Sequence, residues 1–386
     1  MSGAPLVFDC TELFNNPVET GIQRVVRRLL HHWPKTGPAL HVARFDPAHG
    51  LVRVSNAAVA VMQESHDGSS GETVRTIRAR LLSLSPPGQP DLPATAPVLL
   101  PEVFWDPART AFYRTMLTQG TRPVLVLAYD FLPFLEPSLF SIRSGAHLMA
   151  YLRLMADATD VAFISDKTRR DYIDRIMRDP EYKNAGPVLC LGSDGLTAPK
   201  QAWHSGRDSF VCIGTIESRK KQDVVVRCFQ DLWREGVKTR LVLIGHHFAP
   251  SLPPWLEEAL EHPNFTWLKA ASDEQIADAL TSARATIYAA EKEGFGLPPV
   301  ESLHVGVPVI AYAELPSLEG LSEGGQIRLA SMTPDHIKDA VRSMLEEKTA
   351  KTLWRQAKAL KLPTWATFAQ DAAQWCRSVT EPDARP

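Results

Sequence analysis

Short apolar runs alternate with amphipathic stretches along the first half of the chain. The apolar runs predict strands at residues 6–9, 40–45, 97–100, 123–129, 160–165 and 187–191. Helices are predicted between them at 22–33, 107–118, 141–157 and 166–178, the first from apolar residues at helical spacing. Strands that alternate with helices are typical of a parallel, doubly wound sheet, which gives the first half the class α/β.

The same alternation starts again after a linker at about residues 193–208. Strands are predicted at 209–214, 240–245, 265–269 and 285–290, with helices at 222–235, 253–261 and 272–283. We expect an N-terminal domain over 1–195, a C-terminal domain over 196–362 and a last helix from 363 to about 379. In such sheets a ligand should bind in the crevice at the carboxyl ends of the strands.

Residues 64–96 interrupt this pattern. The segment is polar at its start and rich in proline at its end, with a short helix expected near 73–83. A surface insertion is the favoured interpretation, and a loop that gates an acceptor site is the alternative.

Composition and charge exclude some classes of protein but do not identify a function. The 386 residues suffice for two domains, and 44% hydrophobic with 22% charged residues is ordinary for a globular protein. A net charge of −2 gives no general attraction for nucleic acid. The five cysteines lack C-x-x-C spacing, which favours buried thiols in a reducing compartment. With no signal peptide and no long apolar run, we expect a cytoplasmic protein.

A row of cations lies on the predicted helix 22–33. Arg24, Arg27, Arg28 and His31 share the face opposite the apolar one. A solvated helix face is the favoured interpretation. The alternative is a weak peripheral contact with the inner face of the cytoplasmic membrane, worth about 1 kcal/mol per cation on an anionic surface.

The segment 293–301 carries the strongest chemical signal. It places Glu293 in a strand-to-helix loop and Glu301 on the first turn of the following helix, which Gly306 ends. Backbone amides cluster between the two carboxylates, and together they suit an anion; these amides belong to Gly294, Phe295, Gly296 and Leu297. Carboxylates accept pairs of hydroxyl hydrogen bonds, so the segment offers the parts to bind a nucleotide sugar. An acidic loop at a solvated helix end is the alternative.

A second loop supplies positive charge. Arg219, Lys220 and Lys221 follow the predicted strand 209–214 and precede the helix 222–235. Cations at the carboxyl end of a parallel strand suit a diphosphate whose charge grows as a sugar departs. In isolation, such a run is usually a solvated face.

The run 293–301, followed by Gly306-Val307-Pro308, resembles the donor-site signature of the retaining glycosyltransferases of family four, which have the GT-B fold. The resemblance is strong over residues 209–330 and looser over 1–195. It implies two Rossmann-like domains that face across a cleft, with a C-terminal helix crossing back to the first domain.

The resemblance also implies roles for the residues of the second domain. Glu293 would hold hydroxyls of the donor sugar, Glu301 would hold the ribose diol, and the amides of residues 294–297 would contact sugar and phosphate. Lys220 is the first candidate and Arg219 the second for contact with the leaving diphosphate.

In the first domain the resemblance implies two further positions. Gly21, where the helix 22–33 begins, resembles a family glycine that faces the donor phosphates. The run 128–133 resembles a His-Asp-x-x-Pro motif in which Tyr129 replaces the histidine, so Asp130 is a candidate acceptor contact. Turn chemistry beside a half-buried tyrosine is the alternative.

The implied function is transfer of a hexose, taken as mannose-type, from a nucleoside diphosphate sugar to a saccharide or lipid-linked saccharide. The setting would be assembly of a bacterial surface polysaccharide, lipopolysaccharide or capsule, with no cofactor and no metal ion. The sequence leaves two alternatives open. A GT-B sugar-nucleotide epimerase would consume the donor without an acceptor, and a non-catalytic module would only bind the nucleotide sugar.

Overall fold

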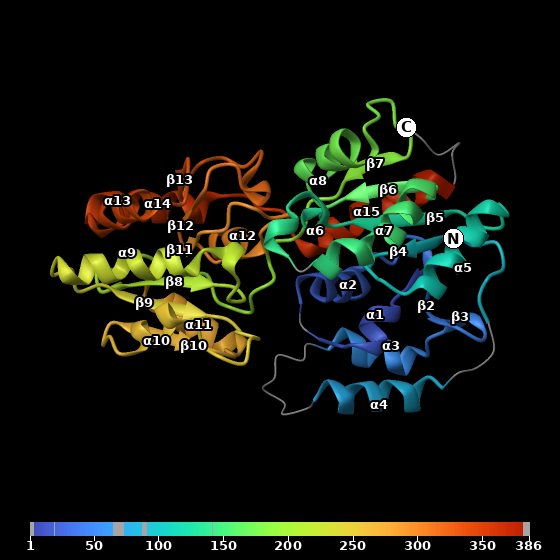
Figure 1. Cartoon of the computed structure of the whole chain (residues 1–386), viewed down its shortest axis with the longest axis horizontal. Coiled ribbons are helices and arrows are strands. Elements are labelled where there is room, and N and C mark those ends of the chain that lie inside the picture. Colours follow the sequence, from blue (N-terminus) through green and yellow to red (C-terminus); the bar gives the residue numbers. More distant parts are fainter. Residues whose placement is uncertain (1–3, 19, 65–72, 87–90, 141, 381–386) are drawn as a thin grey trace. The chain divides into compact units, whose positions relative to one another are not determined.

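The computed structural model describes residues 4–18, 20–64, 73–86, 91–140 and 142–380 (Figure 1). Two compact units divide the chain. Residues 1–192 with 364–386 form the N-terminal unit, and residues 193–363 form the C-terminal unit. The sequence places the corresponding limits after residues 195 and 362.

The N-terminal unit is built on a seven-stranded sheet in the order β3-β2-β1-β4-β5-β6-β7. Its strands are β1 Pro5–Asp9, β2 Ala39–Asp46, β3 Gly50–Arg53, β4 Val98–Leu100, β5 Val124–Ala128, β6 Asp160–Phe163 and β7 Ala185–Val188. The expectation of a purely parallel sheet is wrong at one edge, since β3 is antiparallel to β2. The connection between these two strands is a tight turn, which is too short for the crossover that a parallel pair needs.

Helices surround this sheet. They are α1 Thr11–Asn15, α2 Gly21–His32, α3 Asn56–Gln63, α4 Val74–Leu84, α5 Pro107–Thr118, α6 Leu132–Leu135, the 3-10 turn η1 Pro137–Leu139, α7 Ile142–Asp157, α8 Asp166–Arg170, the π-helical η2 Asp171–Met177 and α15 Trp365–Thr380. The last of these confirms the predicted return of the C-terminal helix to the first domain. It packs on α2, and Trp375 Nε1 donates to Asp160 Oδ1 at 2.8 Å; Figure 1 shows it in red among the elements of this unit.

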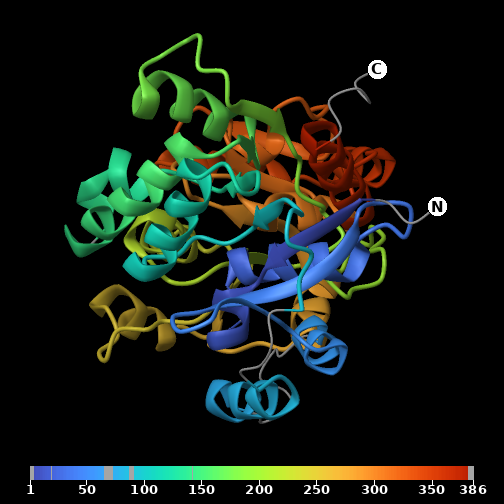
Figure 2. The same cartoon turned by 90° about the vertical axis from the view of Figure 1, so that its right-hand side faces the viewer.

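The segment around α4 was expected to be polar at both ends with a helix in the middle, and α4 is that helix. Residues 65–72 and 87–90 lie outside the described residues. In Figures 1 and 2, α4 lies at the periphery of the N-terminal unit.

The basic face of α2 is less exposed than expected. Arg27 is 4% exposed, and its guanidinium donates to the Met62 carbonyl at 3.0 Å and the Val18 carbonyl at 2.9 Å. The prediction of a solvated face is therefore wrong for Arg27, because α3 covers this side of α2. His31 remains exposed.

The C-terminal unit holds a six-stranded sheet in the order β10-β9-β8-β11-β12-β13, in which every pair is parallel. Its strands are β8 Ser209–Ile213, β9 Arg240–Ile244, β10 Phe265–Leu268, β11 Ala283–Tyr288, β12 Val309–Tyr312 and β13 Gln326–Leu329. Its helices are the 3-10 turns η3 Ser218–Lys220 and η4 Pro316–Leu318, and α9 Gln222–Arg234, α10 Pro254–Leu260, α11 Asp273–Ser282, α12 Leu297–His304, α13 Pro334–Leu345 and α14 Glu347–Ala359.

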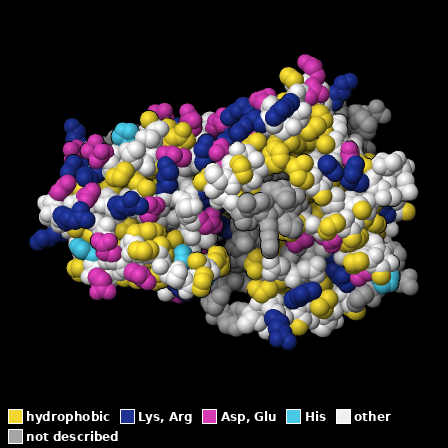
Figure 3. Space-filling view, viewed as in Figure 1, with side chains coloured by type: hydrophobic (Ala, Val, Ile, Leu, Met, Phe, Trp, Pro, Cys, Tyr) yellow, Lys and Arg dark blue, Asp and Glu magenta, His cyan; other side chains and the backbone are white. Residues whose placement is uncertain are grey.

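Charges of both signs are mixed on the surface. Figure 3 shows lysines and arginines interspersed with carboxylates over the face in view. Across the residues that the structure describes, none of the helices is long and apolar enough to cross a membrane.

A buried ion cluster joins the carboxyl ends of β1 and β4. Arg109 of α5 donates to Asp9 at 2.7 Å and to Glu102 at 3.3 Å, and all three side chains are at most 1% exposed. The Tyr113 hydroxyl also donates to Asp9. Burial, with the Asp9 carboxylate nearby, raises the pKa of Glu102 above its ordinary value.

This cluster should contribute far more to stability than a surface ion pair of the same length. Arg109→Met leaves Asp9 buried without a counter-charge, and we expect the free energy of unfolding to fall by about 3–5 kcal/mol. The matched control is Arg114→Met on the same helix, which breaks a 2.7 Å pair with Asp157 whose side chains are 47% and 43% exposed. The control substitution should lower the free energy of unfolding by about 0–1 kcal/mol, as measured by urea unfolding of the whole chain. Equal losses in the two variants would contradict this account.

Candidate functional site

The candidate site lies where the strand order reverses within the C-terminal sheet. Strands β8 and β11 are neighbours, and the strand order runs outward from them in both directions. At such a switch point the loops that leave the two carboxyl ends diverge, and ligands bind between them. Here these are the cationic loop after β8 and the acidic loop between β11 and α12.

Glu293 brings these two loops together. Its Oε1 accepts hydrogen bonds from Arg219 Nη1 at 2.7 Å, Lys220 Nζ at 2.7 Å and the Tyr288 hydroxyl at 2.8 Å. Lys220 Nζ also donates to the Tyr288 hydroxyl at 2.7 Å and lies 5.1 Å from the centre of the tyrosine ring. The structure therefore places the predicted sugar-binding carboxylate in direct contact with both predicted diphosphate-binding cations.

The carboxylate is ionised despite its burial. Burial acts to raise the pKa of Glu293, but Lys220 and Arg219 outweigh it and hold that pKa below its ordinary value. The side chains of Glu293, Lys220 and Arg219 are still 11%, 13% and 17% exposed. All three thus remain within reach of a ligand.

A second ion pair fixes the neighbouring residues of the same loops. Lys221 Nζ lies 2.5 Å from Glu291 Oε2, and Glu291 Oε1 accepts the Met332 amide at 2.7 Å. Lys221 has φ of +52°, which a residue other than glycine adopts at a cost of about 1–3 kcal/mol. Lys221 is thus paired with Glu291 rather than with Glu293.

The start of α12 differs from the predicted anion site. The helix begins at Leu297, so Glu301 lies on its second turn, and the placement of Glu301 on the first turn is wrong. Glu301 is 3% exposed. Pro298 and Pro299 have no N–H, so Leu297 alone among the first three helical residues can offer an amide. The predicted amide cluster therefore belongs to the loop, residues 294–296, more than to the helix. Gly296 fits here because its φ is +91°.

A small hollow lies beside these groups. Its volume is about 170 Å³ including open solvent, and it is lined by Ile213, Thr286, Ile287, Tyr288, Pro298 and Pro299. It therefore lies between the carboxyl ends of β8 and β11 and the first turn of α12.

Gly245 lets the loops after β8 and β9 approach each other. A Cβ at this position would lie 2.1 Å from the Gly214 carbonyl oxygen, and Gly245 has φ of +149°. The Ile216 amide donates to the His246 carbonyl at 2.8 Å, which joins the two loops just beyond this contact. The position of the cationic loop thus depends on a glycine in the next strand's loop.

The two site residues predicted in the N-terminal unit lie in different places within it. Gly21 is the first residue of α2, where a Cβ would meet no atom within 4 Å, so the fold itself does not need a glycine there. Asp130 follows β5 and is exposed, and its Oδ1 accepts the Leu132 amide at 3.0 Å.

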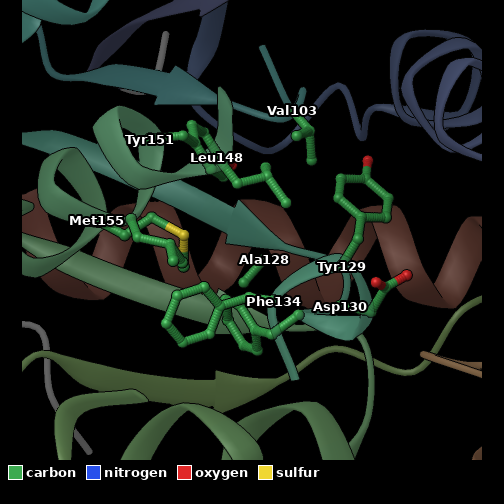
Figure 4. Close-up of a pocket in the computed structure, with 10 residues that line it drawn as sticks. Val103, Ala128, Tyr129, Asp130, Phe134, Leu148, Tyr151 and Met155 are labelled. Atoms are coloured by element: carbon green, nitrogen blue, oxygen red, sulfur yellow. The ribbon is translucent and has the colours of Figure 1, made fainter. Parts of the chain in front are cut away.

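Tyr129 is more buried than predicted. It is 6% exposed rather than half-buried, and its hydroxyl donates to the Pro101 carbonyl at 2.7 Å. Asp130 lies at one edge of an apolar pocket of about 290 Å³, open solvent included, which Leu148, Met155 and Phe134 surround (Figure 4).

Tyr288 is the residue that sequence reasoning missed. It is the last residue of β11, and the pattern there indicated only a buried strand. Its position at the ligand-binding edge of the sheet, five residues before Glu293, was the available signal. For the part of the chain that the structure covers, no group of three or more His, Cys, Asp and Glu side chains is placed to hold a metal ion.

Comparison with known proteins agrees with this geometry. Residues 196–360 match the model of the family described as glycosyl transferases group 1, in agreement with the resemblance seen in the motif. The serotype-specific mannosyltransferase WbdA of Escherichia coli is 25% identical over 402 residues, covering 96% of this chain and 47% of WbdA. Another sequence of that name and organism is 31% identical over 141 residues, covering 36% of this chain and 17% of the relative. The chain thus spans less than half the length of these relatives.

Solved structures show the fold. Sucrose-phosphate synthase from Thermosynechococcus elongatus has a TM-score of 0.65 at 14% identity and covers 98% of this chain and 100% of that structure. WaaG, a glycosyltransferase involved in lipopolysaccharide biosynthesis, has a TM-score of 0.59 at 13% identity and covers 97% of this chain and 100% of that structure. The GT-B fold expected from the sequence is confirmed at the level of its two α/β units.

The contact at Gly245 gives a direct test of how the site is built. Gly245→Ala should lower the thermal stability of the chain markedly, because the new Cβ would meet the Gly214 carbonyl. The matched control is Gly236→Ala, where φ is +88° but a Cβ meets no atom within 4 Å, so only backbone strain of about 1–2 kcal/mol is added. Differential scanning calorimetry of the two variants measures the difference. If Gly245→Ala is no less stable than Gly236→Ala, the close approach of the loops is wrong.

Proposed function

We propose that this chain, whose residues 196–360 match the group 1 glycosyltransferase model, transfers a hexose from a nucleoside diphosphate sugar to a saccharide or lipid-linked saccharide. The setting proposed is the assembly of a bacterial surface polysaccharide. The donor sugar is taken as mannose-type, which the name of the relative WbdA supports.

One observation carries this proposal. Glu293 Oε1 contacts both Lys220 and Arg219 at 2.7 Å, at the carboxyl edge of a parallel sheet. A carboxylate suits sugar hydroxyls, and two adjacent cations suit a diphosphate. In a nucleoside diphosphate sugar these two parts are directly bonded, so the spacing of the side chains matches the chemistry of the donor.

The reaction proposed proceeds with retention at the anomeric carbon. The bond between that carbon and the phosphate oxygen breaks, and a bond to the acceptor oxygen forms on the same face. The acceptor's proton passes to the departing diphosphate, so no protein base is required. Lys220 and Arg219 would stabilise the negative charge that develops on the leaving group, and the amides of residues 294–297 would assist them. No metal ion is part of this proposal.

The remaining assignments complete the donor site as we propose it. Glu301 would hold the ribose diol from α12, and Gly21 would face the phosphates. Asp130 would contact the acceptor, since it is exposed at the carboxyl end of β5. A contact with the inner face of the cytoplasmic membrane is consistent with a lipid-linked acceptor.

The first experiment identifies the donor and separates the competing functions. Purified chain is screened against GDP-mannose, UDP-glucose, UDP-galactose and UDP-N-acetylglucosamine for thermal stabilisation, because a bound donor stabilises by mass action. Each stabilising donor is then incubated alone and with saccharide acceptors. Release of nucleoside diphosphate only with an acceptor supports transfer. An isomerised donor without an acceptor indicates an epimerase, and stabilisation without any release indicates a binding module.

Two substitutions should separate sugar binding from diphosphate binding. We expect Glu293→Ala and Lys220→Ala each to lower transfer by about 10-fold or more, since a lost hydrogen bond to a charged group costs about 1.5–3 kcal/mol. Glu293→Ala should keep its affinity for the nucleoside diphosphate, because both cations remain. Lys220→Ala should lose part of that affinity.

The controls are Glu323→Ala and Lys238→Ala, which remove exposed charges from the same unit. These should leave transfer and nucleotide affinity unchanged, as measured by initial rates and calorimetry. Unchanged turnover in a folded Glu293→Ala variant would contradict the assignment of Glu293 as a contact to the donor sugar.

A further inference from the structure

Lys220, Tyr288 and Glu293 form a closed triangle of hydrogen bonds. The sides join Lys220 Nζ to the Tyr288 hydroxyl at 2.7 Å, Lys220 Nζ to Glu293 Oε1 at 2.7 Å, and the Tyr288 hydroxyl to Glu293 Oε1 at 2.8 Å. All three groups are thus in contact with one another.

Tyr288 is the most rigidly held member of the triangle. It ends β11, whose six residues are all buried, and β11 pairs with β8 on one side and β12 on the other. Glu293 lies in the loop between β11 and α12, and Lys220 belongs to the short turn η3. Elements with few tertiary contacts open more readily than central strands, so the tyrosine is the fixed point to which both loops are joined.

The directions of the hydrogen bonds follow from the chemistry of the groups. A lysine ammonium can only donate, so the tyrosine oxygen accepts from Lys220 and its O–H donates to Glu293. Burial, reinforced by the nearby Glu293 carboxylate, raises the pKa of Tyr288 well above its ordinary value. The hydroxyl therefore keeps its proton and remains a donor.

This arrangement makes the two oxygens of Glu293 unequal. Oε1 accepts three hydrogen bonds, whereas none of the described residues donates to Oε2. The side chain is 11% exposed. Oε2 is therefore the oxygen that a ligand hydroxyl can use.

Of the three groups that donate hydrogen bonds to Oε1, the Tyr288 hydroxyl alone has no other role in the proposed reaction. Lys220 and Arg219 are cations, and in the proposed function they turn toward the diphosphate when the donor binds. The Tyr288 hydroxyl has no such alternative, so it continues to hold Oε1 while the cations are engaged. We infer that Tyr288 is a positioning residue that holds Glu293 Oε1 and so directs Oε2 to the hydroxyls of the donor sugar. This inference rests on the proposed function.

Tyr288→Phe tests the inference because it removes the hydroxyl and keeps the ring beside Lys220. The matched control is Tyr312→Phe, since Tyr312 ends the adjacent strand β12 and its hydroxyl donates to Glu314 at 3.1 Å rather than to Glu293. Calorimetry on the full chain measures the affinities for GDP and GDP-mannose and for UDP and UDP-glucose, and initial rates of transfer are measured with the same donors.

We expect Tyr288→Phe to lower the affinity for the sugar nucleotide, or its rate of transfer, by about 10-fold, while the affinity for the nucleoside diphosphate alone is unchanged. The effect should disappear when Tyr288→Phe is combined with Glu293→Ala, because the residue acts through that carboxylate. Tyr312→Phe should change none of these values.

Equal losses for the nucleotide and the sugar nucleotide would indicate a structural role and overturn the inference. So would a Tyr288→Phe variant with wild-type values throughout. A wild-type chain that binds none of the sugar nucleotides would instead overturn the proposed function, and the inference with it. The two failures are therefore distinguished by the wild-type measurement alone.

Discussion

The convergence of three donors on one oxygen of Glu293 is the interaction on which the site depends. A carboxylate buried alone would take up a proton, and two cations placed side by side would repel each other. Together they are stable, and Arg219 and Lys220 are held against Glu293 at 2.7 Å each. The loops after β8 and β11 are therefore fixed to each other by charge, at the edge where the strand order reverses.

Each unit contains a cluster of ion-paired side chains, and the two clusters differ in how deeply they are buried. In the N-terminal unit Asp9 and Arg109 are both 0% exposed, and their hydrogen bonds are made within the protein. In the C-terminal unit the side chains of the Glu293 cluster are 11–17% exposed, and one carboxylate oxygen is left for a ligand. Burial thus separates a cluster that stabilises the fold from one that can exchange its partners for a substrate.

The sequence was sufficient for the elements and motifs that depend on local pattern. Alternating apolar runs predicted the central strands and α5, and the glycine-rich run predicted the loop around Glu293. The predictions that failed depend on contacts between residues that lie far apart in the sequence. Tyr288 looked like an ordinary strand residue because its partner Lys220 lies 68 positions earlier in the chain. Arg27 looked exposed because its carbonyl partner at Met62 belongs to another helix. Glu301 was assigned to the wrong turn of α12 because that assignment depended on where the helix begins, and local sequence pattern places helix boundaries only approximately.

The central claim is that Glu293 holds the donor sugar while the cations hold its diphosphate. A crystal structure of the chain with an intact sugar nucleotide tests it most directly. We predict Glu293 Oε2 within about 3 Å of a sugar hydroxyl, Tyr288 still bonded to Oε1, and Lys220 and Arg219 on the diphosphate oxygens. A donor bound with its sugar away from Glu293, or with both cations still paired to that carboxylate, would contradict the account.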